Sequence, residues 1–454
     1  MATAPTVTPG KHTQNSQSTN DWRAQLGARL VEPDVAVGHI KSGDRIVISI
    51  AQATPLTLCT ALSGRLMELE NVVVNHGAAA YNWDLPGLGE RYRLESMYCS
   101  PYDRSVYAAG RAEFTPISYY REGALPPGLE NFNVCFIKVT PPDENGFVNF
   151  GDIQIMQKML ARSADLVIAE IEPNYIRVGG DNQLHFSEID FFVERAIDFP
   201  QGILPPVNEE EQRAIATVCA TVAKEFIHDR DTIQIGVGSM SGMLMYHLGN
   251  HHDLGMQTEI IPWGTTPLVQ SGVVTGKYKK IFPELVVGAA FAVLTPQAEL
   301  DLANGDPRYQ LYDFNFTDDI RLIAKEEGLI SINNALSVDL TGQANAESLG
   351  PMMYTGTGGQ TAFVIGASMG GGTTIIVTPS TSVVKGQRVS RIMPGLPPGS
   401  VITSPRTFVH NVVTEYGIAR LKGKSIRERN SELIAVAHPD FRNELRAEAK
   451  RMYG

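Results

Sequence analysis

Two stretches nearly half the chain apart share one pattern, and this repeat constrains the fold more than any other feature of the sequence. Residues 40–50 (IKSGDRIVISI) and 227–237 (IHDRDTIQIGV) each place an aspartate before three alternating aliphatic positions. Such alternation predicts buried strands, and a loop and a helix are expected after each. A weaker pair, residues 163–169 and 361–366, follows in the same order and also predicts strands. The repeat therefore predicts two related domains in tandem.

Strands and helices are expected to alternate along the chain. Apolar strands are predicted at 45–50, 71–74, 134–139 and 165–169, and leucines with helical spacing follow Pro55. This alternation indicates an α/β fold with a largely parallel sheet. Together with the repeat, it predicts two tandem, structurally related α/β domains, each built on such a sheet.

The chain length and the distribution of prolines suggest where these domains begin and end. A chain of 454 residues is long for a single core. Residues 1–20 hold one lysine among Thr, Ser, Gln and Asn, with no apolar core, and predict a disordered tail and no signal peptide. Three prolines and a glycine within 198–206 predict a linker. We therefore expect an N-terminal domain at 21–200 and a C-terminal domain at 201–454.

Charge and cysteine content exclude several classes of function. The net charge of −11 argues against nucleic acid and anionic membranes as partners. It does not exclude small anionic ligands, which backbone amides and a few cations can bind. The longest apolar runs are too short to cross a bilayer. The four cysteines are scattered without a C-x-x-C pair and predict buried, reduced thiols of a cytoplasmic protein: Cys59, Cys99, Cys135 and Cys219.

Two glycine-rich loops could contact a ligand. Residues 236–242 (GVGSMSG) follow a predicted strand and precede a helix, as in a dinucleotide fingerprint, but Ser241 breaks the pattern. A loop that touches an anionic or acyl ligand is favoured there over a nicotinamide site. Residues 356–360 (GTGGQ) hold three glycines in four positions ahead of an apolar stretch interpreted as a strand. Such bare backbone suits amides that point at an oxyanion or a pantetheine chain.

Serine and metal chemistry have weaker support. Residues 366–370 (GASMG) fit the G-x-S-x-G elbow around Ser368, and His410 and His438 could complete a triad. The elbow requires a helix directly after the serine, whereas 370–374 (GGGTT) contain no strong helix former. The pair His251-His252 lies in a polar loop without an i, i+4 partner. We therefore expect neither a serine nucleophile nor a metal site.

Several longer motifs resemble the acetyl-CoA hydrolase/transferase family, which includes 4-hydroxybutyrate, butyrate and acetate CoA-transferases of class I. The resemblance spans roughly residues 25–450. In the C-terminal half it rests on residues 338–343, the GTGGQ loop, 412–419 (VVTEYGIA), 423–429 (GKSIRER) and 437–442 (AHPDFR). In the N-terminal half it rests on residues 110–116, 141–146 and 187–190. It implies that both domains have the class I CoA-transferase fold.

The resemblance also implies roles for particular residues. Residues 253–259 (DLGMQTE) match the family pattern whose final glutamate is the nucleophile, which is here Glu259. The active-site asparagine of the family falls on Asn333. Gly358 and Gly359 are implied to supply an oxyanion-hole amide and to contact CoA. The other predicted oxyanion and CoA-binding residues are Gly236, Val237, Gly238 and Gln360.

The implied activity is CoA transfer between an acyl-CoA and a free carboxylic acid. It would proceed by ping-pong through an acyl-glutamyl anhydride and a glutamyl-CoA thioester, with CoA as a substrate and no permanently bound cofactor. A small carboxylic acid and a second copy of the chain, in a homodimer, are the expected partners. The alternative is an acyl-CoA hydrolase on the same fold, in which water reaches the anhydride. A silent CoA-binding subunit would lack the covalent adduct.

The chain departs from the family pattern at several positions, among them those that carry Ala362, Phe408 and Trp263. The family usually has an aspartate, a polar Arg-Asn-Asp segment and a Met-Phe pair at or near these places. The loss of polar groups and the gain of aromatic rings suggest an altered acyl pocket. We therefore expect a bulkier or more apolar acid than acetate or 4-hydroxybutyrate.

Overall fold

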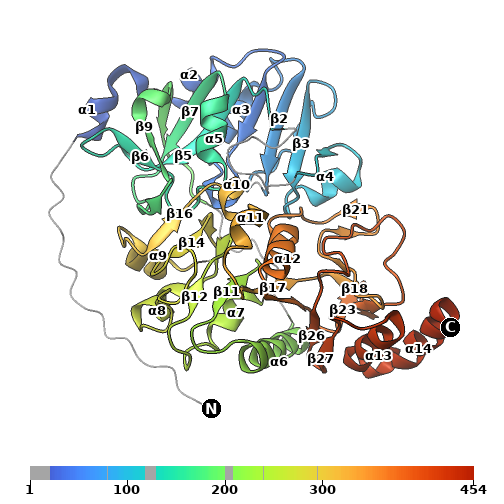
Figure 1. The fold of residues 1–454 in the computed structure, drawn as a ribbon. Helices are drawn as coiled ribbons and strands as arrows, with labels where there is room; N and C mark the ends of the chain where they lie inside the picture. The colour runs from blue at the N-terminus through green and yellow to red at the C-terminus, as the bar shows by residue number, and fades with distance from the viewer. Residues whose placement is uncertain (1–20, 79, 118–128, 200–207, 239, 294) are drawn as a thin grey trace.

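The computed structural model contains two large β-sheets, one from each half of the chain (Figure 1). It describes residues 21–78, 80–117, 129–199, 208–238, 240–293 and 295–454. The predicted tail, 1–20, and most of the predicted linker, 200–206, lie outside the described residues. Within the described part of the chain, no helix is both long and apolar enough to pass through a lipid bilayer.

The first sheet has seven strands in the order β10-β7-β5-β1-β2-β3-β4, and every neighbouring pair is parallel. Helix α3 (Leu56–Arg65) packs on one face and α5 (Gln157–Ser163) on the other, because the central strands are apolar on both sides. The strands are β1 (Arg45–Ile48), β2 (Val72–Gly77), β3 (Tyr92–Tyr98), β4 (Glu113–Phe114), β5 (Val134–Val139), β7 (Leu166–Ile171) and β10 (Phe191–Glu194).

The second sheet has six strands in the order β12-β11-β17-β22-β26-β27, parallel except for the last pair. Helix α6 (Glu209–Phe226) covers one face. Asn208 caps its N-terminus and three glutamates fill its first turn, which stabilises that end. The strands are β11 (Thr232–Ile235), β12 (Gly255–Met256), β17 (Ile330–Asn334), β22 (Thr373–Val377), β26 (Asn411–Thr414) and β27 (Gly417–Arg420).

The two sheets repeat one strand order, which confirms the predicted fold of two related α/β units. The order β2-β1-β5-β7-β10 in the first sheet matches β12-β11-β17-β22-β26 in the second. The first repeat of the sequence therefore pairs true counterparts, β1 and β11. The second repeat is wrong: residues 361–366 lie in helix α12 (Gln360–Met369), and β22 is the counterpart of β7. A short apolar run is compatible with either element, and here it forms a helix buried against Ile323 and Leu329.

Short elements connect the two sheets and extend the C-terminal half. Strand β8 (Gly179–Gly180) of the first half pairs with β16 (Tyr309–Leu311) of the second. The other helices are α1 (Trp22–Leu26), α2 (Pro33–Val37), α4 (Arg104–Ala108), α7 (Ser241–Met245), α8 (Thr265–Gln270), α9 (Gln297–Ala303), α10 (Phe314–Thr317), α11 (Ile320–Ile323), α13 (Ile426–Val436) and α14 (Arg442–Tyr453). The other strands are β6 (Phe147–Asn149), β9 (Gln183–His185), β13 (Ile260–Ile261), β14 (Val286–Gly288), β15 (Ala290–Phe291), β18 (Ser337–Asp339), β19 (Ala344–Asn345), β20 (Ser348–Leu349), β21 (Met352–Met353), β23 (Thr381–Val384), β24 (Gln387–Ser390) and β25 (Ile392–Met393). All four cysteines are free and buried, as predicted.

Polar contacts join the two halves near the carboxyl end of the first sheet. Arg104, in α4 of the first half, donates a hydrogen bond to the carbonyl of Tyr354 and its guanidinium lies 3.5 Å from the centre of that ring. Gln52, in the 3-10 turn at residues 51–53 that follows β1, donates to the carbonyl of Phe291 at 3.0 Å. Helices α10, α11 and α12 lie between the sheets (Figure 1). Ligands of parallel α/β sheets bind at such carboxyl ends.

Candidate active site

Glu259 lies between β12 and β13, where its backbone is fixed from both sides. The carbonyl of Glu259 accepts a hydrogen bond from Ala289 at 2.7 Å. The preceding Thr258 donates its backbone N–H to the carbonyl of Val287 and its hydroxyl to the carbonyl of Ile235, at 3.0 and 3.3 Å. The side chain of Glu259 is half-buried. This anchoring presents the carboxylate from a rigid segment, as a positioned reacting group requires.

The glycine loop before α12 meets this carboxylate. The amide of Gly359 donates to Glu259 Oε2 at 2.8 Å. If Gly359 were replaced by a residue with a side chain, its Cβ would lie closer than 3.0 Å to that oxygen. A Cβ added to Gly358 would lie 3.6 Å from Glu259 Oε1. Gly358 also has a φ of +52°, which favours glycine. The structure thus brings together Glu259, Gly358 and Gly359, as the family resemblance implies, at the N-terminus of a ten-residue helix whose dipole favours negative charge.

Burial changes the acidity of Glu259. Removal from water raises the pKa of this carboxyl to about 7, and the hydrogen bond from Gly359 partly opposes the rise. Burial raises the pKa of a carboxyl because it penalises the charged form. At neutral pH a large share of Glu259 is therefore ionised, and this carboxylate is more basic than an exposed one. Basicity of this kind favours nucleophilic attack.

Two residues that the sequence motifs did not indicate border the same loop. The ring of Tyr98, at the end of β3, lies 3.8 Å from the position that a Cβ added to Gly358 would occupy. Burial, followed by the charge of Glu259, raises its pKa to about 12, so its hydroxyl keeps a proton. Asp318 is fully buried, and its Oδ2 lies 2.6 Å from the place of a Gly359 Cβ. Two adjacent acids directly after residues 314–317 (FNFT), which include two phenylalanines, are the signal that could have indicated Asp318.

Asn333 belongs to a buried hydrogen-bond network on the second sheet. Its Nδ2 donates to Gln234 Oε1 at 3.0 Å and to Ser331 Oγ at 2.9 Å, and its Oδ1 accepts from Gln234 Nε2 at 3.1 Å. The residue is 2% exposed. Among the described residues, the structure shows no hydrogen bond between Asn333 and Glu259. Asn333 instead contacts the other predicted loop, because a Cβ on Gly236 would stand 2.5 Å from its Oδ1.

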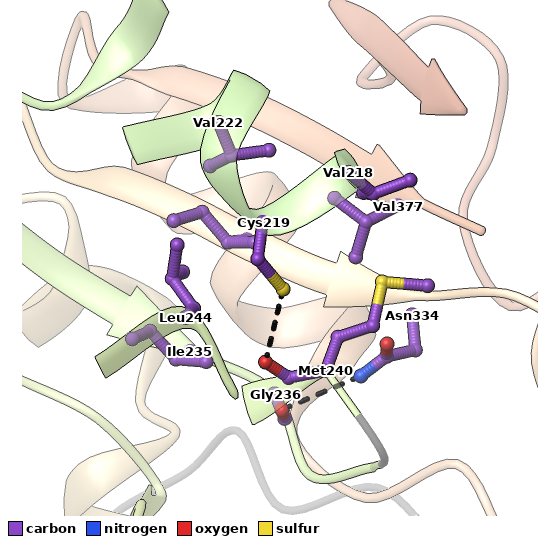
Figure 2. Close-up of a pocket in the computed structure, with 10 residues that line it drawn as sticks. Val218, Cys219, Val222, Ile235, Gly236, Met240, Leu244, Asn334 and Val377 are labelled. Carbon is purple, nitrogen blue, oxygen red and sulfur yellow. Dashed lines mark hydrogen bonds between the residues drawn. The ribbon is translucent and has the colours of Figure 1, made fainter. Parts of the chain in front are cut away.

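The loop at 236–238 follows β11 at the carboxyl end of the second sheet. The side-chain amide of Asn334 donates to the carbonyls of Val237 at 2.8 Å and Gly236 at 3.4 Å, and Val237 is 47% exposed. A Cβ on Gly238 would stand 2.8 Å from that amide nitrogen. Figure 2 shows the small cavity that is lined by Gly236 of this loop together with Cys219 and Met240. Its volume of about 10 Å³ matches one water molecule and is too small for an acyl chain.

Gln360 and Ser368, which both lie in α12, make contacts away from Glu259. Gln360 donates its side-chain amide to Ser404 Oγ at 3.0 Å. Ser368 lies 3.2 Å from His410 Nε2, whose ring also accepts at Nδ1 from the backbone of Thr374. Nε2 therefore carries the proton and donates to the serine, the reverse of a general-base contact. Ser368 lies near the end of a helix, so the strained elbow is absent at this described position.

Three departures from the family pattern lie in different surroundings. Ala362 is buried in α12, and Phe408 lies beside the amino end of β22, where its carbonyl accepts from Thr374. Trp263 packs on α7, because a Cβ on Gly242 would overlap its ring, and it meets Tyr246 edge-on with ring centres 5.4 Å apart. These contacts give the expected change of acyl pocket no direct support. Within the described ranges, no three His, Cys, Asp or Glu side chains are grouped as a metal site.

Comparison with known proteins finds family models and relatives that match most of the chain. The acetyl-CoA hydrolase/transferase N-terminal domain matches residues 13–203, and the C-terminal domain of that name matches residues 297–449. The 4-hydroxybutyrate coenzyme A transferase of Clostridium kluyveri is 34% identical over 95% of this chain and 100% of its own. The butyryl-CoA:acetate CoA-transferase of Anaerostipes caccae is 33% identical over 95% of this chain and 98% of its own.

A solved structure agrees. The crystal structure of RipA from Yersinia pestis superposes with a TM-score of 0.86 at 29% sequence identity, over 95% of this chain and 99% of that one. Two domain matches, two full-length relatives and one full-length structure therefore point to one family. The chain belongs to the acetyl-CoA hydrolase/transferase family.

Proposed function

We propose that this protein transfers CoA between an acyl-CoA and a small carboxylic acid by a ping-pong reaction on Glu259. The observation that carries the proposal is the 2.8 Å hydrogen bond from the Gly359 amide to the Glu259 carboxylate at the contact of the two halves. The full-length relatives reported above are CoA transferases, which supports the reaction class. Glu259 is half-buried, so it can be reached while it is shielded from most solvent.

The first step is attack of the Glu259 carboxylate on the thioester carbonyl. An O–C bond forms, the C–S bond breaks, and the products are an acyl-glutamyl anhydride and the CoA thiolate. A thiolate leaves readily, so a weak carboxylate nucleophile suffices. The thiolate then attacks the glutamyl carbonyl of the anhydride, which releases the first acid and leaves glutamyl-CoA. An incoming carboxylate repeats both steps in reverse order.

Each attack places negative charge on a carbonyl oxygen next to the glycine loop. The amide of Gly359, which binds the free carboxylate in this structure, is positioned to donate to that oxygen instead. A donor of this kind contributes about 3 to 4 kcal/mol to the barrier reduction. Residues 236–238, of which Val237 is exposed, follow β11 at the carboxyl end of the second sheet. This loop offers a surface along which the elongated CoA chain extends.

Trapping the covalent adduct tests this proposal. The enzyme is mixed with acyl-CoA, treated with borohydride or hydroxylamine, and mapped by peptide mass spectrometry. The modification is expected on Glu259 and is expected to be absent in Glu259→Gln. Glu299→Gln is a matched control, because Glu299 also accepts hydrogen bonds from a glycine amide, that of Gly264. An unmodified Glu259 in an active enzyme would refute the mechanism.

A steady-state assay distinguishes transfer from hydrolysis. A transferase consumes the thioester at full rate only when a carboxylic acid acceptor is present, because the anhydride is otherwise shielded from water. A hydrolase reaches the same rate without an acceptor. We expect the acceptor to raise the rate strongly.

A further inference from the structure

A second carboxyl group lies beside the glycine whose amide donates to Glu259. Asp318 is 0% exposed and follows α10. Its Oδ1 accepts a hydrogen bond from the hydroxyl of Thr317 at 3.0 Å, and its Oδ2 has no hydrogen-bond partner among the described residues. A Cβ on Gly359 would meet Asp318 Oδ2 at 2.6 Å and Glu259 Oε2 closer still. One oxygen of Glu259 and one oxygen of Asp318 therefore both lie against the single position that a Cβ on Gly359 would occupy.

The charges around Asp318 do not favour a carboxylate there. Glu259 faces it from the segment before β13, and Asp313, at the start of α10, adds a further acid. Arg321, the nearest cation in the sequence, has its guanidinium on Asp319, the next residue along the chain. The N-terminus of α12 is the favourable group, and its Gly359 amide already donates to Glu259. A fully buried carboxylate with an unpaired oxygen beside a second carboxylate would be very costly.

We propose that Asp318 is a positioning residue that keeps its proton and holds Gly359 against Glu259 as a neutral group. Burial, and then the charge of Glu259, raise the pKa of Asp318 well above its ordinary value, in agreement with this geometry. A neutral Asp318 leaves Glu259 as the one negative charge of the pair, and that charge passes to the oxyanion during attack. An ionised Asp318 would place a second charge beside the oxyanion and oppose its formation.

This inference rests on the proposed function, and one experiment separates the two. Single-turnover acylation of Glu259 by acyl-CoA is followed from about pH 5.5 to 9.5. In the wild type the rate is expected to rise as Glu259 ionises and to fall in alkali as Asp318 loses its proton. In Asp318→Asn, which is permanently neutral, the alkaline fall is expected to disappear while the acidic rise stays at the same pH. Asp318→Ala, which removes the group against Gly359, is expected to lower the rate about tenfold or more across the range.

Two further variants serve as control and second test. Asp319→Asn makes the same chemical change one residue away and keeps a residue that can cap α11, so its profile is expected to follow the wild type. Thr317→Val removes a hydrogen bond that favours the anion of Asp318, so it is expected to move the alkaline fall to higher pH. This variant decides the question if Asp318→Asn does not fold.

Two outcomes would overturn the inference. One is an acidic rise that moves to lower pH by a unit or more in Asp318→Asn, because it would show that Asp318 is an anion in the working enzyme. The other is an alkaline fall in the wild type that persists unchanged in that variant. A wild type that forms no adduct on Glu259 at any pH refutes the proposed function itself, and this inference with it.

Discussion

Replacing Gly359 by alanine is the sharpest test of the amide loop. Gly359 has a φ of −84°, which alanine adopts freely, so the backbone conformation itself is not strained. The added methyl group would lie closer than 3.0 Å to Glu259 Oε2 and 2.6 Å from Asp318 Oδ2, whereas ordinary contacts begin at 3.4 Å. The loop or the carboxylate must therefore retreat by roughly 1 Å, and displacements of that size commonly reduce rates about a hundredfold.

The same retreat lengthens the hydrogen bond between Gly359 and Glu259, which is 2.8 Å in the wild type, beyond the useful range. Loss of one oxyanion donor costs about 3 to 4 kcal/mol, so kcat is expected to fall by about 10² to 10³. The assay is CoA transfer with saturating acid, together with thermal unfolding of each variant. Gly64→Ala is the matched control, because Gly64 lies in α3 with open space around it and the change is expected to add about 1 kcal/mol of stability. A Gly359→Ala enzyme with kcat within threefold of the wild type would contradict the assignment of this amide.

Three further predictions concern acidity, packing and thiol chemistry. Burial raises the folded-state pKa of Glu259 to about 7, so the stability that the protonated side chain contributes is complete below its unfolded-state pKa and is lost as pH rises to about 7. Glu259→Gln should therefore be about 3 kcal/mol more stable than the wild type at pH 8 by urea unfolding, and the difference should shrink to about 1 kcal/mol near pH 5. Gly242→Ala should lower the free energy of unfolding by about 1 to 3 kcal/mol, because the added methyl group would overlap the ring of Trp263. In a thermal unfolding series, the double variant Gly242→Ala/Trp263→Leu should regain much of this stability. Equal losses in the single and double variants would contradict the contact between Gly242 and Trp263. Burial raises the pKa of all four cysteine thiols and shields them from reagents. An aromatic disulfide that reacts with free thiols should therefore label none of them in the native enzyme and all four after unfolding. Rapid labelling of the native enzyme would show that the thiols are accessible.

The fold was largely predictable because its signals are local. The aspartate and alternating aliphatic residues at 40–50 and 227–237 predict β1 and β11, and the strand orders show that these are counterparts. The stretch at 361–366 suggests a strand from its sequence alone, because six mostly apolar residues are too few to show a helical period. Its burial on several sides as part of α12 is a tertiary property that the local pattern does not contain.

The site was predictable only where residues lie in motifs. Glu259 and Gly359 were indicated by the family resemblance, and the hydrogen bond between them is consistent with the proposed pairing. Asp318 and Tyr98 reach the same loop from α10 and β3, far away in the sequence, so no spacing rule could place them there. The contact of Asn333 with Gln234 and Ser331 depends on the register of β11 and β17, which the sequence alone does not give.

The repeated strand order has a consequence for how such a protein can change. Glu259 and Gly359 both belong to the half built on the second sheet, whereas Tyr98, which borders their loop, comes from the half built on the first. After a duplication, one copy can preserve the reacting groups under strict selection while the other drifts. Substitutions in the first half can then reshape what enters the site without disturbing the chemistry. We therefore expect sequence variation near the site to be greater in the first half, which contributes Tyr98, than in the second half, which contributes Glu259 and Gly359.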